Sequence, residues 1–254
     1  MPFSGGARTP KTVVYTVIMG GYDVLLPTPR LPDIDFVAFC DAPLYSSYWD
    51  VQIIRPVFPA DLARSSRLHK ILPHRFLPDY DISIYIDGNI LVKGELRSLI
   101  EKGLKDHSIA AFDHSYTQDP KNCIYQEFEA VKSFAADRQK KLDDPEILEK
   151  HHQFLISEKY PKEHGLNNGG VLLRRHHDPQ VVKAMELWWN MVKHYSKRDQ
   201  LSLNYALWKS DLEICSLPYD IRRKNPWFYH VGGHNENVSF RLLKYKLKKW
   251  FGRI

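Results

Sequence analysis

The residues best suited to chemistry are Asp87 and Asn89, which flank Gly88 directly after the apolar run 82–86. A carboxylate at the end of a buried strand is costly to desolvate unless it meets a cation or hydrogen-bond donors. Carboxylate and amide oxygens suit Mg²⁺ or Mn²⁺, and such an ion also takes phosphate oxygens. Gly88 lets a ligand approach the backbone closely. The pattern predicts a metal–diphosphate site, although Asp-Gly-Asn is also good turn chemistry.

Three cations stand three residues apart in the helical stretch 61–72, namely Arg64, Arg67 and Lys70. At this spacing they share one side of a helix. Arginine can form two parallel hydrogen bonds to phosphate or carboxylate oxygens, so the stripe suits a diphosphate or an acidic sugar. A solvated helix face would have the same spacing, and both interpretations stay open at this point.

These residues need a sheet to position them, and the sequence shows patterns typical of its strands. Short β-branched and aromatic runs recur, and several are apolar at consecutive positions, which is typical of strands buried on both faces of a mostly parallel sheet. We expect strands at 13–19, 36–40, 51–54, 82–86, 109–112, 171–173 and 213–217. Helical stretches at 61–72 and 179–195 separate some of them. The alternation predicts an α/β domain with flanking helices and a ligand site beyond the carboxyl ends of the strands.

Residues 115–165 interrupt this alternation. Apolar residues at helical spacing lie on both sides of Asp143-Asp144-Pro145, so we expect a helical insertion. Such an insertion would serve as a lid on the acceptor side of the site. We therefore divide the chain into a catalytic domain, 1–239, which includes this insertion, and a C-terminal helix, 240–254.

The C-terminal segment 240–254 predicts a basic amphipathic helix. It carries six lysines and arginines and no acid, which accounts for the whole net charge of +6. Such a helix can lie in the interface of an anionic membrane, or it can dock on the domain with a solvated basic face. Since the body of the chain is neutral, nothing predicts nucleic acid as a partner. The apolar stripe consists of Phe240, Leu243, Leu247, Trp250 and Ile254.

Composition limits the class of protein. A chain of 254 residues with 43% hydrophobic and 26% charged residues is typical of one globular α/β domain. No run approaches the roughly 20 apolar residues of a membrane span, and residues 1–11 lack the apolar segment of a signal peptide. Cys40, Cys123 and Cys215 are far apart and form no CxxC pair, which indicates reduced thiols in a cytoplasmic protein.

Four motifs, taken in order, resemble a known enzyme family. The stretch from Arg67 (Arg-Leu-x-x-Ile-Leu-Pro) to Asp87-Gly88-Asn89 resembles the signature around the DxD motif of retaining family 8 glycosyltransferases, which have the GT-A fold. Asn168-Gly169-Gly170 is similar to that family's Asn-Ser-Gly-Val strand, and Asp199-Gln200 begins a segment similar to its Asp-Gln-Asp-x-Leu-Asn. Residues 230–234 are similar to its His-x-x-Gly loop, with the glycines at different positions.

The whole chain resembles a related family still more closely. That family was long described as a domain of unknown function and is now described as glycosyltransferase-like. Its plant members are tied to pectin and mucilage synthesis, and one is tied to alkaline ceramidase activity. This resemblance implies a GT-A-like fold and a nucleotide-sugar, with UDP as the expected nucleotide.

The resemblance to family 8 implies that Asp87 and His230 ligate a divalent metal, with Asn89 beside them. A neutral imidazole suits Mn²⁺ somewhat better than Mg²⁺. Asn89 stands where the family has a second Asp, and its amide oxygen is a weaker ligand. Loose metal binding, binding only together with the nucleotide, and a metal-independent variant all stay open. A plain loop histidine is the alternative for His230.

The resemblance also implies where the donor binds. The end of the first strand, at Gly21 and Tyr22, would cradle the base, with the aromatic ring available for stacking. Asp41 would bind the base or ribose, and Arg67 matches the family motif. The residues expected to bind the donor are Gly21, Tyr22, Asp41, Arg64, Arg67, Lys70, Gly88, Gly232, Gly233 and His234.

For catalysis, the resemblance implies roles for Asp199, Gln200 and Asn168 near the anomeric carbon. With retention of configuration, the leaving diphosphate would accept the acceptor's proton, so the protein mainly supplies positioning and charge stabilisation. The metal, Lys70 and the backbone amides of 232–233 would stabilise the diphosphate. A carboxylate favoured by the helix dipole is the alternative for Asp199.

The sequence therefore predicts a metal-assisted, retaining hexosyl- or uronosyltransferase. Its acceptor would be a glycan or a lipid-linked saccharide, with peripheral attachment at the inner membrane face as an option. One rival is an amide hydrolase of the ceramidase type, but the chain contains no HExxH, no GxSxG and no convincing histidine cluster. Another rival is a non-catalytic sugar-nucleotide-binding module in which Asn89 marks a decayed metal site.

Overall fold

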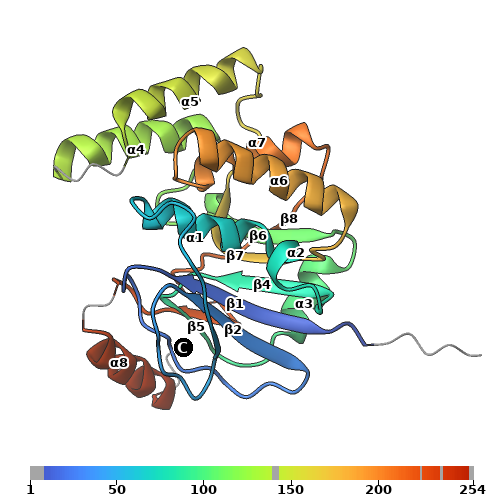
Figure 1. Cartoon of the computed structure of the whole chain (residues 1–254), viewed down its shortest axis with the longest axis vertical. Coiled ribbons are helices and arrows are strands. Elements are labelled where there is room, and N and C mark those ends of the chain that lie inside the picture. Colours follow the sequence, from blue (N-terminus) through green and yellow to red (C-terminus); the bar gives the residue numbers. More distant parts are fainter. Residues whose placement is uncertain (1–8, 139–142, 224, 235–236, 252–254) are drawn as a thin grey trace, which may run out of the picture.

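A seven-stranded sheet in the order β3-β2-β1-β4-β7-β6-β8 runs through the protein. Figure 1 shows most of this sheet together with the helices beside it. The computed structural model describes residues 9–138, 143–223, 225–234 and 237–251. β7 pairs antiparallel with β4 and β6, and the remaining ladders of this sheet are parallel. The predicted mostly parallel α/β sheet is thus confirmed. The strands are β1 (Thr12–Ile18), β2 (Ile34–Cys40), β3 (Asp50–Ile53), β4 (Ile82–Ile86), β6 (Ile109–Asp113), β7 (Asn167–Arg174) and β8 (Cys215–Leu217).

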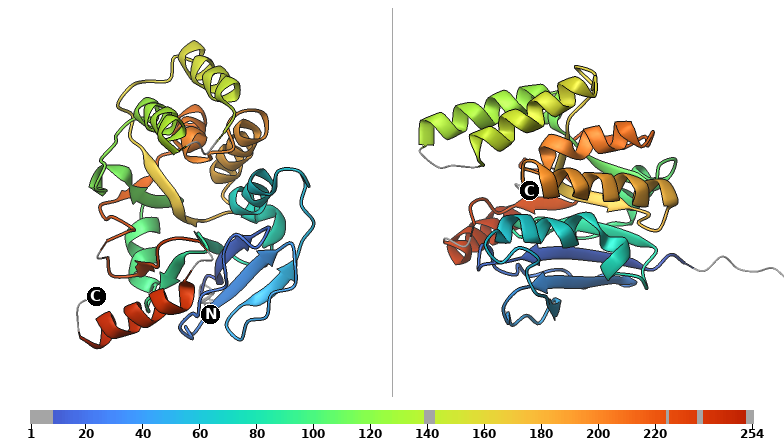
Figure 2. Two further views of the ribbon diagram at one scale, coloured as in Figure 1. Left: turned by 90° about the vertical axis from the view of Figure 1, so that its left-hand side faces the viewer. Right: turned by 45° about the horizontal axis from the view of Figure 1, so that its top comes forward.

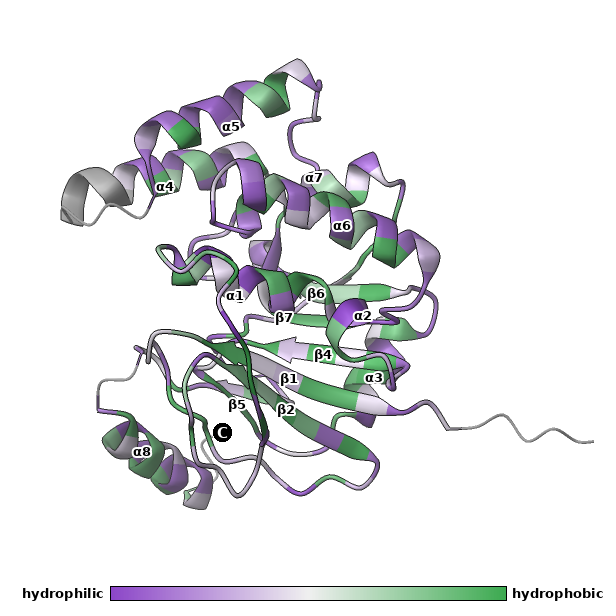
Figure 3. Cartoon of the chain, in the orientation of Figure 1, coloured by the Kyte–Doolittle hydropathy of each residue, from purple (hydrophilic) through white to green (hydrophobic). Residues whose placement is uncertain are grey.

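Both faces of the sheet are covered, because the buried strands carry apolar side chains on each side. Alternate residues of β1 enter opposite cores: Val13 and Tyr15 pack toward one, Val14 and Ile18 toward the other. Figure 3 shows hydrophobic stretches along β1 and β2. The first core includes α1 (Leu62–Ile71), α6 (Pro179–His194) and α7 (Gln200–Lys209), and the second includes α3 (Arg97–Leu104). The short α2 (Pro73–Phe76) follows α1 directly.

The apolar run 90–92 belongs to a second sheet. The turn Asp87-Gly88-Asn89, closed by Ile90 N donating to the Asp87 carbonyl at 2.9 Å, separates β4 from β5 (Ile90–Val92). β5 pairs antiparallel with β9 (Phe228–His230), which the sequence analysis did not predict. This ladder sets His230 opposite Ile90, next to the Asp87 turn.

The predicted insertion is helical. It follows β6 and the 3₁₀ turn η1 (His114–Tyr116), and contains α4 (Ile124–Arg138) and α5 (Pro145–Ser157). Asp144 caps α5 by accepting from Glu146 N, with Pro145 at the first helical position. A separate apolar cluster, which includes Phe128, Leu155 and Tyr205, joins the insertion to α7. Figure 2, left, looks onto the edge where the strands of the large sheet end, with α4 and α5 at one end and α8 (Val238–Trp250) at the other.

The C-terminal helix α8 docks on the domain, but through a face different from the predicted stripe. Tyr245 is buried against Leu26, Leu91 and Val231, whereas the predicted stripe from Phe240 to Trp250 is exposed. Ile254 lies outside the described residues. Among the helices of the described ranges, none has the length and apolar character needed to cross a bilayer. The three cysteines are free thiols.

Candidate active site

Asp87 lies at the carboxyl end of β4, where two neighbours hold its carboxylate. The Tyr85 hydroxyl donates to Asp87 Oδ1 at 2.8 Å, and Lys70 Nζ lies 3.7 Å from the same oxygen. Tyr85 precedes Asp87 by two residues, so both project from the same face of the strand. The Asp87 side chain is 43% exposed and lines a cavity. The carboxylate is therefore fixed on one side and open to a ligand on the other.

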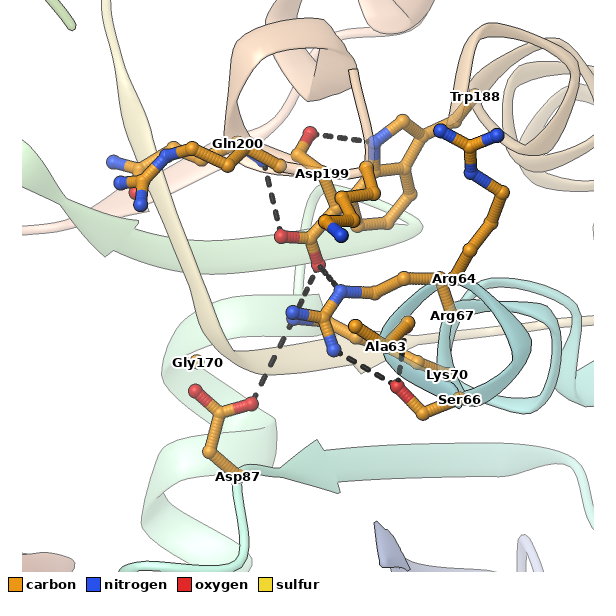
Figure 4. A network of polar contacts seen from close by, with 12 residues as sticks. Ala63, Arg64, Ser66, Arg67, Lys70, Asp87, Gly170, Trp188, Asp199 and Gln200 are labelled. Carbon is orange, nitrogen blue, oxygen red and sulfur yellow. Dashed lines mark hydrogen bonds and ion pairs between the residues drawn. The ribbon is translucent and has the colours of Figure 1, made fainter. Parts of the chain in front are cut away.

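A buried ion pair lies behind Asp87, as Figure 4 shows. Lys70 Nζ lies 2.5 Å from Asp199 Oδ2, and Arg67 Nε lies 3.4 Å from the same oxygen. Burial opposes ionisation of Asp199, but Lys70 and Arg67 outweigh it and hold the pKa of Asp199 at about 2. Asp199 also caps α7 by accepting from Gln200 N at 3.1 Å. Asp199 therefore lies at a helix N-terminus, as its alternative interpretation expected, and its ion pairs join it to the network around Asp87. Its role at the donor sugar stays a prediction.

The glycines of β7 provide the space for this network. A Cβ on Gly169 would lie 3.4 Å from Lys70 Nζ, and one on Gly170 would lie 3.0 Å from Asp87 Oδ2. The Gly170 carbonyl also accepts from Asp87 N at 2.9 Å, and Asn168 Oδ1 accepts from Gly170 N at 2.7 Å. Asn168 therefore shapes the backbone beside Asp87. Because Gly169 and Gly170 have no side chain, Lys70 can approach Asp87 and Asp199.

A fully buried guanidinium supports the base of the network. Arg174 donates to the carbonyls of Lys70 at 3.0 Å and Ile71 at 3.1 Å, and the Tyr15 hydroxyl donates to the Lys70 carbonyl at 2.6 Å. These carbonyls belong to the last turn of α1, whose acceptors lack partners within the helix and carry the negative end of its dipole. Burial lowers the pKa of Arg174. No sequence pattern pointed to Arg174, which fixes the backbone that carries Lys70.

A cavity of about 520 Å³ opens at this edge of the sheet. Its size falls in the range of roughly 300–1,000 Å³ that is usual for small-molecule sites. The lining combines the end of β1, one side of α1, the Asp87 turn and the C-terminal loop. Site residues predicted from the sequence that line it are Tyr22, Arg67, Asp87, Gly88 and His234.

Two segments from opposite ends of the chain form one wall of this cavity. The rings of Tyr22 and His234 lie 4.1 Å apart between centroids, and His234 Nδ1 lies 3.1 Å from Asp23 Oδ1. A Cβ on Gly88 would approach the Asp23 Cβ to 2.7 Å. The bare backbone at Gly88 therefore accommodates Asp23, and because Gly88 also lines the cavity, its close approach to a ligand stays a prediction. Asp23 itself was not among the predicted site residues.

Several predicted donor-binding residues lie outside the cavity lining. Arg64 turns to the end of α6, where its guanidinium donates to the carbonyls of Lys193 at 3.4 Å and Tyr195 at 3.1 Å. Both oxygens of Asp41 accept from Gly20 N, which fixes the turn after β1. Gly21 belongs to this turn and, like Gly20, has a positive φ. Arg64 and Asp41 thus have partners within the protein, and the ligand contacts expected for them stay predictions.

The predicted metal ligands lie on two adjacent segments. Val231 N donates to the Asn89 carbonyl at 2.9 Å, which continues the β5–β9 pairing beyond His230. Burial lowers the pKa of His230, and nearby Asp87 opposes that shift, so the imidazole is neutral at pH 7. In the part of the chain that is described, no three His, Cys, Asp or Glu side chains converge as a metal site would require. A carboxylate, an amide oxygen and a neutral imidazole are nevertheless a chemically suitable set for Mn²⁺.

The glycine loop after β9 is held by α8. Gly232 and Gly233 both have positive φ, where glycine is favoured. Arg241 of α8 donates to the Gly232 carbonyl, and a Cβ on Gly233 would collide with the same guanidinium. The Gly233 carbonyl accepts from Asn89 Nδ2 at 3.5 Å. The loop is therefore connected both to the Asp87 turn and to the C-terminal helix.

A mostly parallel sheet with one reversed strand, and an acidic turn at its cavity edge, agree with the GT-A-like fold that the sequence motifs led us to expect. A sequence model for the family described as "TOD1/MUCI70, glycosyltransferase-like domain" matches residues 38–218. The chain belongs to this family. A search of curated proteins found no match.

The solved structures similar to this chain include two glycosyltransferases. The apo structure of the bifunctional glycosyltransferase WbbM has a TM-score of 0.50 and 13% identity, covering 95% of this chain and 45% of that one. The apo form of the glycosyltransferase GlyE from Streptococcus pneumoniae TIGR4 has a TM-score of 0.41 and 13% identity, covering 82% of this chain and 45% of that one. This chain thus spans less than half the length of either. The similarity to WbbM supports the fold alone. Membership of the family supports assignment of this chain as a glycosyltransferase.

Proposed function

We propose that this protein transfers a sugar from a nucleotide-sugar, with UDP as the nucleotide, to a glycan or lipid-linked saccharide. One observation carries the proposal: the cavity beside β4 exposes a carboxylate and a guanidinium, Asp87 and Arg67, in front of the buried pair of Lys70 and Asp199. Arg67, together with a divalent ion held by Asp87, would suit a ligand with a compact, strongly negative centre.

The cavity offers separate places for the base and the diphosphate. One face of the Tyr22 ring lies on His234 while the side chain remains 62% exposed, so the other face can stack on a base. Arg67 lies deeper in the cavity lining and suits diphosphate oxygens. Asp87, Asn89 and His230 would hold a divalent ion, which when bound neutralises charge on the diphosphate.

Lys70 would stabilise the negative charge that develops as the diphosphate leaves. Its ammonium is held by Asp199 and its backbone by Arg174, so little reorganisation is needed during the reaction. In a retaining transfer the leaving oxygen takes the acceptor's proton, which requires positioning more than a strong base. Asp199 suits a positioning role, since its pKa of about 2 makes it a weak base. The acceptor would approach from the side of α4 and α5.

The central experiment measures UDP binding by isothermal titration with and without Mn²⁺, and sugar release or transfer from UDP-sugars. Asp87→Asn should lower turnover by about 100-fold or more, because it removes a charge at the diphosphate site. Asp79→Asn changes an exposed carboxylate near the opposite end of the same strand and should leave turnover unchanged.

Full turnover in Asp87→Asn, or no UDP binding by the native protein, would refute the proposal. UDP binding without transfer to water or any glycan would instead identify a sugar-nucleotide-binding module. Cleavage of lipid amides with bound zinc would identify the hydrolase.

A further inference from the structure

Helix α8 has two apolar faces, and the domain covers one of them. Tyr245 is 8% exposed and packs with Leu26, Leu91 and Val231. We name the opposite side the outer face, and it carries large side chains that remain in solvent. Its residues and exposed fractions are Phe240 68%, Leu243 53%, Leu247 46% and Trp250 79%. Phe251, 63% exposed, extends this face past the helix end. Large apolar side chains gathered on one exposed face usually mark an interaction surface.

Lysines border the outer face along both edges. At about 100° of rotation per residue, Lys244 and Lys248 fall on one side of it and Lys246 on the other. Residues 241–254 contain no acidic side chain, so the charge around this face has a single sign. An apolar stripe with lysines at its borders is the pattern of a helix that lies in a lipid interface, where lysine stems extend toward headgroups.

We propose that α8 binds the surface of an anionic lipid bilayer through its outer face. Leu243, Leu247 and Trp250 would enter the boundary between headgroups and acyl chains, and the bordering lysines would contact lipid phosphates and carboxylates. A second copy of the chain fits this face poorly, because pairing two such helices would bring like charges together. An anionic bilayer matches both the apolar and the cationic parts.

The same helix reaches the cavity through its inner side. Arg241 donates to the Gly232 carbonyl and Tyr245 packs on Val231, and this loop continues to His234 in the cavity lining. Figure 2, left, shows α8 beside the edge where the strands end. Bilayer binding through α8 therefore sets the cavity edge near lipid headgroups. On the proposed function, that is where a lipid-linked acceptor would present its saccharide.

The test is flotation of the full chain with phosphatidylcholine vesicles, with and without phosphatidylserine. Wild type should float with the anionic vesicles, and Leu243→Glu combined with Leu247→Glu should weaken binding by about tenfold or more. The matched control is Ile156→Glu, an apolar residue of α5 that is 49% exposed, which should bind like wild type.

Two further measurements test the role of the lysine charges and the depth at which Trp250 enters the bilayer. Lys244→Glu with Lys246→Glu should reduce binding to anionic vesicles, and Lys183→Glu, exposed on α6, should not. Trp250 fluorescence should be quenched by brominated lipids, and Trp250→Phe should remove that quenching.

Absence of flotation, or equal flotation of wild type and the Leu243/Leu247 variant, would overturn the proposal. So would a wild-type dimer that the same variant dissociates in the absence of lipid. UDP affinity measured in parallel keeps this result separate from the donor site.

Discussion

Lys70 shows how one side chain connects the parts of the site. Its ammonium lies between Asp199 at 2.5 Å and Asp87 at 3.7 Å, and 4.8 Å from the centre of the Tyr85 ring. A buried ammonium is costly unless close partners compensate for lost hydration. Here two carboxylates and an aromatic face do so. The ammonium is therefore held in place by protein groups instead of water, although Lys70 does not itself line the cavity.

The space beside Asp87 yields a prediction at the residue scale. Gly170→Ala would bring a Cβ to 3.0 Å from Asp87 Oδ2 and 2.9 Å from Asn168 Oδ1. We expect turnover to fall by about tenfold to 100-fold, because small displacements of positioned groups are costly. Gly94→Ala is the control, since a Cβ there meets nothing within 4 Å. Circular dichroism checks the fold, and equal activity of the two variants would contradict the prediction.

Sequence patterns could find only part of this site. Tyr85 was predictable, because residues two apart in a strand share a face. The pair of Lys70 and Asp199 was not, since it joins α1 to the start of α7 and no local spacing encodes it. Arg64 and Arg67 lie one turn apart on the same side of α1, so the sequence does not tell them apart. In the structure Arg64 turns to the end of α6, whereas Arg67 lines the cavity. Only the position of α6 distinguishes them.

At the scale of elements, buried strands were the most predictable features, because consecutive apolar residues leave few alternatives. The helix α3 was missed, and its Gly103 explains why. Glycine lowers helix propensity, yet a Cβ there would lie 2.9 Å from Ala110 Cβ. Close packing of α3 on the sheet thus requires a glycine, and that glycine weakens the helical pattern in the sequence. β9 was missed because a three-residue strand carries little pattern.

The insertion contains a histidine that makes its stability sensitive to acid. His151 is fully buried between the rings of Phe128 and Tyr195, each 5.2 Å away. Burial lowers the pKa of His151 from 6.5 to about 3. As pH falls through this window, the unfolded chain binds a proton that the folded chain excludes, so stability is full above pH 6.5 and declines toward pH 3.

We expect His151→Leu to flatten the fall in Tm between pH 6.5 and about 3. Part of the slope should remain, because burial also lowers the pKa of His69 and of His176 to about 4. Thermal unfolding at a series of pH values measures this. His194→Leu alters an exposed histidine and should keep the wild-type slope, and an unchanged slope in His151→Leu would refute the prediction.

For the whole molecule, the C-terminal helix and the cavity beside Asp87 form one unit. Arg241→Ala should weaken UDP binding several-fold even without lipid, because the Gly232 carbonyl loses its donor and the loop to His234 is freed. Lys249→Ala, exposed on the same helix, is the control. Titration calorimetry measures both, and equal affinities would show that the loop holds its shape without α8. Truncation before α8 would therefore disturb the cavity as well as the outer face.

The insertion leaves and rejoins the sheet at a single point. His114 N donates to the Leu166 carbonyl at 2.9 Å, so the two ends of the segment between β6 and β7 meet where β6 ends. This closure follows from the reversed direction of β7, which begins where β6 ends. A segment with adjoining ends can be exchanged for one of another length without shifting strand register. On the proposed function, related chains could thus differ in the acceptor that they use while keeping the same cavity.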